Sequence, residues 1–548
     1  MNILLVKAPE VDFFMLDKPV QQRSIATPVL PQGILHLGTW IKDRLPGTRI
    51  RYVDLHLDAY DLYQAEQRFP DPDTWFHRRL WEAAAGEKFD IVGLSANMNA
   101  FADNFHRTAR AAQETFPGAL VVAGGHYPSS YTARVADDPH LDHVVVGEGE
   151  LPFTRLAEDW AQGRRGAERV LDTGDRINDF NMFPELDWDG VGTERYTKAG
   201  SFGVGEEARR LTVLTSRGCP MHCTYCATHS VWDHGFRPQS PERMVATLAF
   251  LKDRYGVTHF SFVDDNFLIN KNRTKAFCRL LLDRGLNIHW YPSTAQVNSL
   301  DRESVALMAR SGCDGIAVAI ESGSKEVQKM IRKRVRLDHA REMMTAMREH
   351  GMNAQALFMF GFPGETLAQM EETIHYARSL ECDWYYGGIA TPLNGTEMYR
   401  TCEENGFFTV DPGQTTTFME GSIATPDFTP DQVEEMLTRF NYQLNFLENR
   451  AFLSGDYQKI LPNYERIARL YPDHFIVQYM LFRIYRSQGR RAEAQGMAQI
   501  LMRLRRDDPE RIEGLIRRFD LDLEAVVAFL EKKTGGAEED SRPDADFS

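Results

Sequence analysis

Three cysteines close together form the strongest chemical signal in the sequence. Cys219, Cys223 and Cys226 follow a CxxxCxxC spacing within the segment SRGCPMHCTYC, directly after an apolar run at residues 212–215. That run is typical of a buried strand, so all three thiols are expected on one loop at a strand end. Three thiolates can bind three irons of a cubane cluster and leave the fourth iron open to another ligand.

A structural zinc ion is the alternative occupant of this loop. Such a site needs a fourth protein ligand, which His222 or His229 could supply. A zinc ribbon would also show a second CxxC pair, and the four remaining cysteines form none. These are Cys278, Cys313, Cys382 and Cys402. They lie in apolar surroundings, where they are expected to be buried as small hydrophobic side chains. We therefore favour an iron–sulfur cluster.

Polar turns follow several of the later predicted strands. Each turn alone is what any tight loop would contain, but their order at successive strand ends indicates one binding site. The turns are Asp264-Asp265-Asn266, Glu321-Ser322-Gly323, GFPGE at residues 361–365 and TPLNGT at residues 391–396.

The cysteine spacing, the aromatic Tyr225 before the third cysteine and these ordered turns resemble the radical S-adenosylmethionine (SAM) superfamily. The resemblance implies a [4Fe-4S] cluster on Cys219, Cys223 and Cys226. Its open iron would chelate SAM, whose cleavage yields a 5'-deoxyadenosyl radical. The residues implied to bind SAM are Tyr225, Asp264, Glu321, Ser322, Gly323, Gly361 and Pro363. Asn394 departs from the proline that the family usually carries in the last turn.

The elements around this site alternate between strand and helix over residues 211–420. Six such units predict a parallel, incomplete (βα)6 barrel of the TIM type, whose chemistry lies on loops after the strands. Predicted strands cover 212–215, 259–263, 288–291, 315–320, 354–360 and 384–389. Predicted helices cover 241–255, 271–284, 301–311, 338–350 and 366–380.

Residues 1–150 show a second alternating pattern, which predicts a Rossmann-like, doubly wound domain. Predicted strands cover 2–7, 49–54, 90–95, 120–123 and 143–146, and predicted helices cover 32–45 and 104–116. Turns rich in glycine, Gly124-Gly125 and GEGE at residues 147–150, follow two of these strands. Ligands of such sheets bind at the carboxyl ends of the strands.

A Rossmann-like domain ahead of a radical SAM barrel resembles the cobalamin-dependent class of the superfamily (class B). The resemblance implies that cobalamin binds at Ser95, Gly124, Gly125, Gly147 and Glu148. Glycines at strand ends are also what any doubly wound sheet needs, and such a domain can persist without cobalamin. Asp54-Leu55-His56 begins like the DxHxxG motif whose histidine ligates cobalt, but it ends in Ala59 and follows the second strand. We expect no cobalt–histidine bond there.

The resemblance implies a C-methyltransferase that methylates an unactivated carbon through methylcobalamin and the 5'-deoxyadenosyl radical. No catalytic acid or base beyond the cluster ligands is needed for that step. Alternatives are a cobalamin-class cyclase or ring-rearranging enzyme, as in tetrapyrrole-ester cyclisation, and a non-enzymatic cobalamin-binding scaffold or sensor. Methylthiolation would need a second cysteine set in the front domain, which contains no cysteine.

The remaining segments are a connector at residues 151–210, a helical region at 421–534 and an acidic, disordered tail at 535–548. The helical region resembles tetratricopeptide (TPR) pairs, because Gly455-Asp456-Tyr457 and Gly489-Arg490-Arg491 recur at a spacing of 34 residues. Such helices can bind a partner protein. A basic group there could be a solvated face or a contact for an acidic partner; its members are Arg483, Arg486, Arg490 and Arg491.

Composition and charge exclude some classes of protein. The 548 residues have a net charge of -15, which argues against a general nucleic-acid or anionic-membrane binder. No apolar run approaches a membrane span, and the N-terminus lacks a signal-peptide pattern, so we expect a cytoplasmic protein. The expected partners are a small-molecule, lipid, tetrapyrrole or natural-product substrate and an electron donor such as flavodoxin or ferredoxin.

Two groups of residues could contact that substrate. The aromatic residues could line an apolar pocket or belong to the core; they are Trp384, Tyr385, Tyr386 and Phe418. Asp233, His234 and Arg237, just after the cysteine loop, could touch substrate, but an ordinary polar loop is the simpler interpretation.

Overall fold

The computed structural model describes residues 1–16, 25–67, 69–164, 166, 168–172, 174–198, 208–293, 295–412 and 418–531. The acidic tail predicted at 535–548 lies outside these residues. The chain divides into two compact units. The first contains residues 1–382 and 386–437, and the second contains residues 383–385 and the chain from 438 onward.

The front of the first unit is a parallel sheet in the order β2-β1-β3-β4-β5-β6. Its strands are β1 (Asn2–Lys7), β2 (Arg49–Asp54), β3 (Ile91–Ser95), β4 (Leu120–Gly124), β5 (His143–Val145) and β6 (Val170–Leu171). The side chains of residues 3–6 are fully buried, as a sheet covered on both faces requires. The predicted doubly wound fold is confirmed, and β6 adds a strand from within the segment predicted as a connector.

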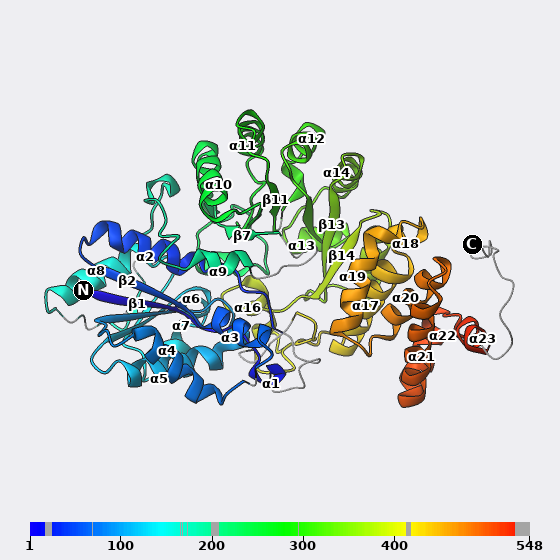
Figure 1. Ribbon diagram of the computed structural model, residues 1–548, viewed down its shortest axis with the longest axis horizontal. Helices are drawn as coiled ribbons and strands as arrows, with labels where there is room; N and C mark the ends of the chain where they lie inside the picture. The colour runs from blue at the N-terminus through cyan, green and yellow to red at the C-terminus, as the bar shows by residue number, and fades with distance from the viewer. Residues whose placement is uncertain are drawn as a thin grey trace. The chain divides into compact units, whose positions relative to one another are not determined.

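Helices cover both faces of this sheet (Figure 1). On one face, α2 (Gln32–Arg44) and α8 (Glu150–Ala161) pack on Ile3 and Leu5 through a shared apolar core. On the other face, α4 (Pro72–Ala84) and α5 (Ala102–Thr115) pack on Leu4 and Val6. Shorter helices complete the domain: α1 (Phe13–Leu16), α3 (Leu55–Gln64), α6 (His126–Ser130) and α7 (Thr132–Ala136). The sequence pattern did not predict α3 and α4.

The barrel follows in the same unit, apart from the first two residues of its last strand. Its strands are β7 (Arg210–Val213), β10 (His259–Phe262), β11 (His289–Pro292), β12 (Gly315–Glu321), β13 (Asn353–Phe360) and β14 (Trp384–Ile389). They form two sheets, β11-β10-β7 and β12-β13-β14. Parallel bridges from Trp290 to Cys313 and from Ala295 to Val318 join the two. The predicted barrel strands are confirmed, with ends that differ by one or two residues.

The barrel helices lie between these strands along the chain and form its outer layer (Figure 1). They are α10 (Pro241–Tyr255), α11 (Lys271–Asp283), α12 (Arg302–Arg310), α14 (Leu337–Glu349) and α15 (Leu367–Arg378). Short helices occur in the connections: α9 (Thr193–Lys198), α13 (Lys325–Met330) and α16 (Glu397–Glu404). The antiparallel pair β8 (Ser216–Arg217) and β9 (Arg237–Pro238) closes the loop that carries the three cysteines.

The second unit is helical. It contains the end of α17 (Pro430–Tyr442), then α18 (Arg450–Leu453), α19 (Tyr457–Leu470), α20 (Phe475–Ser487), α21 (Arg491–Asp507), α22 (Pro509–Phe519) and α23 (Leu523–Glu531). Helix α20 is its centre, because residues 475–482 are all buried. The two glycine turns precede α19 and α21, which confirms the predicted helical region. No helix in the described residues is long and apolar enough to cross a membrane.

Candidate active site

A cavity of about 570 Å³ lies at the carboxyl ends of the barrel strands. Its volume is typical of a small-molecule site. It brings together six of the residues predicted from the sequence: Cys219, Cys223, Tyr225, Cys226, Asp264 and Glu321. The cavity also receives residues that the sequence analysis did not assign to the site, among them Met221, Thr228, Asp265, Asn266, Gln296 and Lys333.

The cysteine loop turns sharply at Gly218, whose φ is +80°. A Cβ atom there would lie 2.0 Å from the carbonyl oxygen of Gly235, so only glycine fits between the two ends of the loop. Burial raises the pKa of the Cys219 thiol and raises the pKa of Cys223 to about 11. A metal must therefore displace these protons when it binds.

The donor set fits a multinuclear cluster better than a single ion. Among the described residues, only His259, His289 and Asp314 place three possible ligand atoms within 4.8 Å of one another. The three loop thiols are more widely spaced, whereas one tetrahedral zinc ion needs its ligands closer together. His229 is engaged elsewhere, because its Nε2 atom lies 2.9 Å from the Met221 carbonyl oxygen.

Two buried aspartates hold the cysteine loop from the end of β10. Asp264 accepts hydrogen bonds from the Thr215 amide at 2.7 Å and from the Ser216 hydroxyl at 2.5 Å. Asp265 accepts from the Gly218 amide at 3.0 Å. Burial raises the pKa of both carboxyls, that of Asp265 to about 6. These carboxylates therefore fix the backbone at the start of the cysteine loop.

Asn266 offers the cavity a free acceptor. Its Nδ2 atom lies 3.7 Å from the Cys219 sulfur, and its Oδ1 atom is buried without a hydrogen-bond partner. A buried amide oxygen without a partner is costly unless a ligand donates to it. This residue therefore fits a ligand that brings an N–H or O–H group next to the cluster. The Asp-Asp-Asn turn is recognisable in the sequence, but only Asp264 is predicted from it to bind SAM.

A buried ion pair crosses the cavity wall. The Glu321 carboxylate accepts hydrogen bonds from the Tyr225 hydroxyl and from the Lys333 ammonium, each at 3.0 Å. Burial and the Glu321 charge raise the pKa of Tyr225. Lys333 lies between Arg332 and Arg334, whose φ angles of +54° and +55° are unusual for residues with side chains.

Lys333 was not found by sequence reasoning. It follows α13 within the basic run Arg332-Lys333-Arg334, which reads as a solvated loop. The Gln328 amide ties this loop to β12, since it donates to the Ile320 carbonyl and accepts from the Val335 amide. The tertiary fold, rather than any local pattern, brings the lysine to the cavity.

The other residues predicted to bind SAM do not line the cavity but shape its turns. The Ser322 hydroxyl and the Gly323 amide each lie 3.0 Å from the Thr373 hydroxyl. Gly361 has a φ of +86°, and Pro363 follows in the same turn. Their contacts with SAM stay predictions.

Glu365 closes that turn. Its carboxylate accepts hydrogen bonds from the amides of Gly361 at 2.8 Å and Phe362 at 3.1 Å. Burial nevertheless raises its pKa to about 7, because the side chain is removed from water. The Phe362 ring lies 5.5 Å from the Tyr225 ring, so the turn also supports the cavity wall.

The aromatic residues separate into two groups. Tyr386 and Phe418 line the cavity and are positioned to contact an apolar substrate. Trp384 and Tyr385 belong to the second unit, where they pack against Phe446 and Phe440, respectively.

The residues predicted to bind cobalamin lie at the carboxyl edge of the front sheet. Ser95 and Gly124 end β3 and β4. Gly125 has a φ of +100°, and a Cβ atom there would lie 2.6 Å from the Ala96 carbonyl oxygen. A Cβ atom at Gly124 would meet nothing within 4 Å, so this glycine leaves open space beside the edge. His56 is bonded through Nε2 to the Ala26 carbonyl oxygen, which agrees with a structural role.

Glu148 is engaged in a different set of contacts. Its carboxylate bonds to Arg217 at 3.0 Å and to Arg237, and its side chain is only 2% exposed. Glu150 bonds to Arg217 at 2.7 Å. A direct bond from Glu148 to cobalamin would have to break these ion pairs, so its assignment to the cofactor remains only a prediction.

Arg217 is the centre of this network. Its guanidinium lies about 5 Å from three aromatic rings, those of Phe180, Phe183 and Trp232. Arg237 belongs to the same network, because it donates to the Glu148 carboxylate and to the Ile177 carbonyl oxygen. Asp233 pairs with Arg176, and the His234 ring stacks on His222 and lies tilted against His229.

Loops of the two domains also meet directly beside the cysteines. The Ser130 hydroxyl lies 2.8 Å from that of Ser230, and the Asn394 amide donates to the Ser130 carbonyl at 2.6 Å. The His126 ring lies edge-on to Trp232 at 5.9 Å. The carboxyl edge of the front sheet thus adjoins the cysteine loop.

Two family models match the chain. The model of the radical SAM superfamily matches residues 213–377, and that of the B12 binding domain matches residues 44–157. An uncharacterized methyltransferase, PH0819, of Pyrococcus horikoshii is 26% identical over 80% of this chain and 91% of its own. Cytidylyl-2-hydroxyethylphosphonate methyltransferase of Streptomyces wedmorensis is 28% identical over 66% of this chain and 76% of its own.

Solved structures share the fold. The radical SAM methyltransferase TsrM of Kitasatospora setae, with cobalamin and a [4Fe-4S] cluster, has a TM-score of 0.58 at 17% identity. It covers 79% of this chain and 81% of its own. The cobalamin-dependent SAM radical enzyme OxsB has a TM-score of 0.62 at 14% identity and covers 97% of this chain and 84% of its own.

The two matched domains imply a [4Fe-4S] cluster, SAM and cobalamin as cofactors, and the three thiols, the Asn266 oxygen and the open edge at Gly124 fit such groups. The chain belongs to the cobalamin-dependent radical SAM enzymes, in which a B12-binding domain precedes the radical SAM domain.

Proposed function

We propose that this enzyme is a C-methyltransferase that acts on an unactivated carbon of a small molecule. One observation carries the proposal: helix α6, which follows β4 at the carboxyl edge of the front sheet, contacts the loop that holds the three cysteines. A cofactor on the front sheet and a cofactor on the cysteine loop would then face a common substrate. Methyltransferases among the relatives support the same reaction.

The chemistry follows from the cofactors together: when bound, the cluster and SAM supply a hydrogen-abstracting radical, and cobalamin supplies the methyl group. The chain's own residues bind and orient the cofactors and the substrate, and they exclude water from the site. Cys219, Cys223 and Cys226 would ligate the cluster, and the Asn266 amide oxygen would accept a hydrogen bond from SAM. No side chain needs to act as an acid or base on the substrate.

The substrate pocket combines an apolar and a polar part. Tyr386, Phe418 and Leu357 offer apolar surface, whereas Ser293 and Gln296 offer hydrogen bonds. This combination suits a small molecule with an apolar reacting carbon and polar substituents. An electron donor of the flavodoxin or ferredoxin type would reduce the cluster. We also propose that the C-terminal helices bind a partner protein and that the enzyme is cytoplasmic.

Metal content is the first test. The full chain is reconstituted anaerobically with iron, sulfide and hydroxocobalamin, and iron and cobalt are measured after gel filtration. We expect about four irons and one cobalt per chain, as a cubane cluster and one cobalamin require. The Cys223→Ala variant should lose the iron, whereas Cys402→Ala, which alters a buried cysteine away from the loop, should keep it.

Product analysis then separates the reactions. A methyltransferase that uses SAM both as the methyl donor and as the source of the radical releases S-adenosylhomocysteine together with 5'-deoxyadenosine. Release of 5'-deoxyadenosine without S-adenosylhomocysteine, in the presence of a turned-over substrate, would instead identify a cyclase or ring-rearranging enzyme. Iron without cobalt would contradict methyl transfer through cobalamin, and zinc in place of iron would contradict the radical chemistry.

A further inference from the structure

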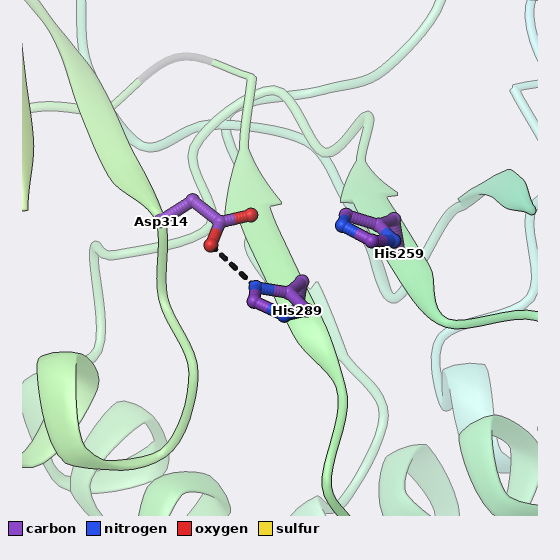
Figure 2. A group of neighbouring side chains, drawn as sticks. All are labelled: His259, His289 and Asp314. Carbon is purple, nitrogen blue, oxygen red and sulfur yellow. Dashed lines mark hydrogen bonds and ion pairs between the residues drawn. The ribbon is translucent and has the colours of Figure 1, made fainter. Parts of the chain in front are cut away.

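Three possible metal ligands lie at the opposite end of the barrel from the cysteine loop. His259 begins β10, His289 begins β11, and Asp314 immediately precedes β12. The two histidines are direct partners in the parallel register of β10 and β11. The Asp314 amide donates to the Trp290 carbonyl at 3.0 Å, which places the aspartate beside the start of β11. Figure 2 shows the three side chains on these adjoining segments.

The alternation of the strands places both imidazoles on one face. Phe260, Phe262 and Trp290 are buried, and Phe262 contacts Phe277 of α11, so these side chains face the helices. Residues next to them in the strands must point to the other face. Tyr291 does so and bonds to Gln355 of β13 at 2.9 Å, across the inner side of the barrel. His259 and His289 therefore stand side by side on the inner face, at its amino-terminal opening.

The donor atoms are close enough to share one ion. One ligand atom from each residue lies within 4.8 Å of the other two. The imidazole rings are 4.5 Å apart and within 7° of parallel, and the His289 Nδ1 atom lies 2.7 Å from the Asp314 Oδ1 atom (Figure 2). The side chains of His289 and Asp314 are 55% and 43% exposed, so an ion can enter from solvent.

We propose that His259, His289 and Asp314 bind a Zn²⁺ ion that the radical chemistry does not use. Two imidazoles and a carboxylate are ligands that zinc accepts in tetrahedral geometry, with water in the fourth place. The backbone of neighbouring strands fixes the spacing of the three residues, so only their side chains need to reorient on binding. Residues at the amino-terminal face of such barrels serve stability rather than chemistry. The ion would therefore join the starts of β10, β11 and β12.

Arg210 provides a competing positive charge. It is the register partner of His259 on β7, and its charge acts on both His259 and Asp314. A guanidinium and a divalent ion repel each other when they approach the same carboxylate. Removal of this charge should therefore tighten zinc binding, an outcome that mere damage to the site would not produce.

The test uses the full chain with its iron–sulfur cluster reconstituted, so that the loop cysteines are already occupied. Calorimetric titration with Zn²⁺ should show one site per chain. The double variant His259→Ala/His289→Ala should lose that site, and Asp314→Asn should weaken it at least tenfold. His375→Ala, an exposed histidine on α15, is the matched control and should bind like the parent. Arg210→Gln should bind zinc more tightly.

Two further readouts locate the ion and monitor folding. Zn²⁺ should raise the melting temperature of the parent chain but not that of the double variant, because a ligand stabilises only a fold that binds it. Equal melting temperatures of the two proteins without zinc show that the variant folds. Co²⁺ in the same site should show d–d bands without thiolate charge transfer. Unchanged zinc stoichiometry in the double variant, no zinc binding by the parent, or a thiolate band from Co²⁺ would each overturn the proposal.

Discussion

At the scale of single residues, the turns around the cavity contain acids whose protonation depends on burial. Glu365 is the clearest case. It is fully buried and accepts two amide hydrogen bonds, which favour the charged form. Loss of hydration outweighs these bonds and raises its pKa from 4.5 to about 7. The turn at residues 361–365 therefore holds a carboxyl group that is partly protonated at neutral pH.

This shift predicts how stability depends on pH. Between pH 4.5 and 7 the folded chain holds a proton on Glu365 that the unfolded chain has released. The contribution of this residue to the free energy of unfolding therefore falls as pH rises through that window, by about 3 kcal/mol in all. Glu365→Gln keeps an oxygen acceptor for the Gly361 amide but cannot ionise. Its stability relative to the parent should rise by a similar amount over the window.

Urea unfolding of parent and variant at a series of pH values measures this difference. Glu326→Gln is a suitable control, since Glu326 is an exposed glutamate in the first turn of α13. A difference between Glu365→Gln and the parent that does not change with pH would contradict the assignment.

At the scale of elements, two adjacent glycines at the end of β4 are under different constraints. Gly125 has a positive φ and no room for a Cβ atom, whereas Gly124 has an ordinary φ and open space. We expect Gly125→Ala to lower the free energy of unfolding by about 1–3 kcal/mol through strain. Gly124→Ala should change stability by less than about 0.5 kcal/mol. It should nevertheless weaken cobalamin binding, because the added methyl group enters the space left for the cofactor.

Chemical unfolding and a visible-absorbance titration with hydroxocobalamin measure the two effects separately. If Gly124→Ala binds cobalamin as tightly as the parent does, the open edge at Gly124 is not the cofactor site. If Gly125→Ala is as stable as the parent, strain at that turn is absent.

The elements also show what the sequence could predict. The patterns of residues 2–7, 49–54 and 384–389 predicted strands with the observed bounds, although only the first of these strands is a buried apolar run. β6 consists of two residues, and its pairing with β5 is a backbone contact that no side-chain pattern records. Helix α4 was missed although Asp71 caps it and Pro72 begins it, since its apolar residues are interrupted by charged ones.

Site residues that belong to a sequence motif were predictable, whereas those that only the tertiary fold brings to the cavity were not. The three cysteines, Tyr225, Asp264 and Glu321 come from ordered motifs at strand ends, and the cavity brings them together. Lys333 reaches the same cavity from a basic loop, and Glu148 turns away from the sheet edge towards Arg217. Both outcomes depend on contacts between residues distant in sequence, which a local pattern does not contain.

At the scale of the whole molecule, Arg217 connects the front domain to the barrel. Its side chain is 2% exposed and pairs with Glu148 and Glu150, which are also buried. Arg217→Met would leave the buried Glu150 carboxylate without its cation, whereas Glu148 would keep Arg237. We expect a loss of about 3–5 kcal/mol in the free energy of unfolding, the range typical of a broken buried pair.

Arg254→Met is the matched control, because Arg254 pairs with Asp189 on the surface, where the two side chains are 57% and 67% exposed. It should cost less than about 1 kcal/mol. The double variant Arg217→Met/Glu150→Gln should recover part of the loss, since it also removes the unpaired charge of Glu150. Equal effects of Arg217→Met and Arg254→Met on denaturant unfolding would contradict the role of the buried network.

Arg217 is separated from the first cysteine, Cys219, by Gly218 alone, and its two acidic partners come from the turn before α8 and the first residue of that helix. The cysteine loop is therefore anchored by residues that are synthesised before it and belong to the other domain. This arrangement sets an order for biogenesis. We therefore expect the front domain to fold and pack on the barrel before an iron–sulfur carrier protein meets three correctly placed thiols. Cluster insertion would then serve the cell as a checkpoint on the assembly of the whole enzyme.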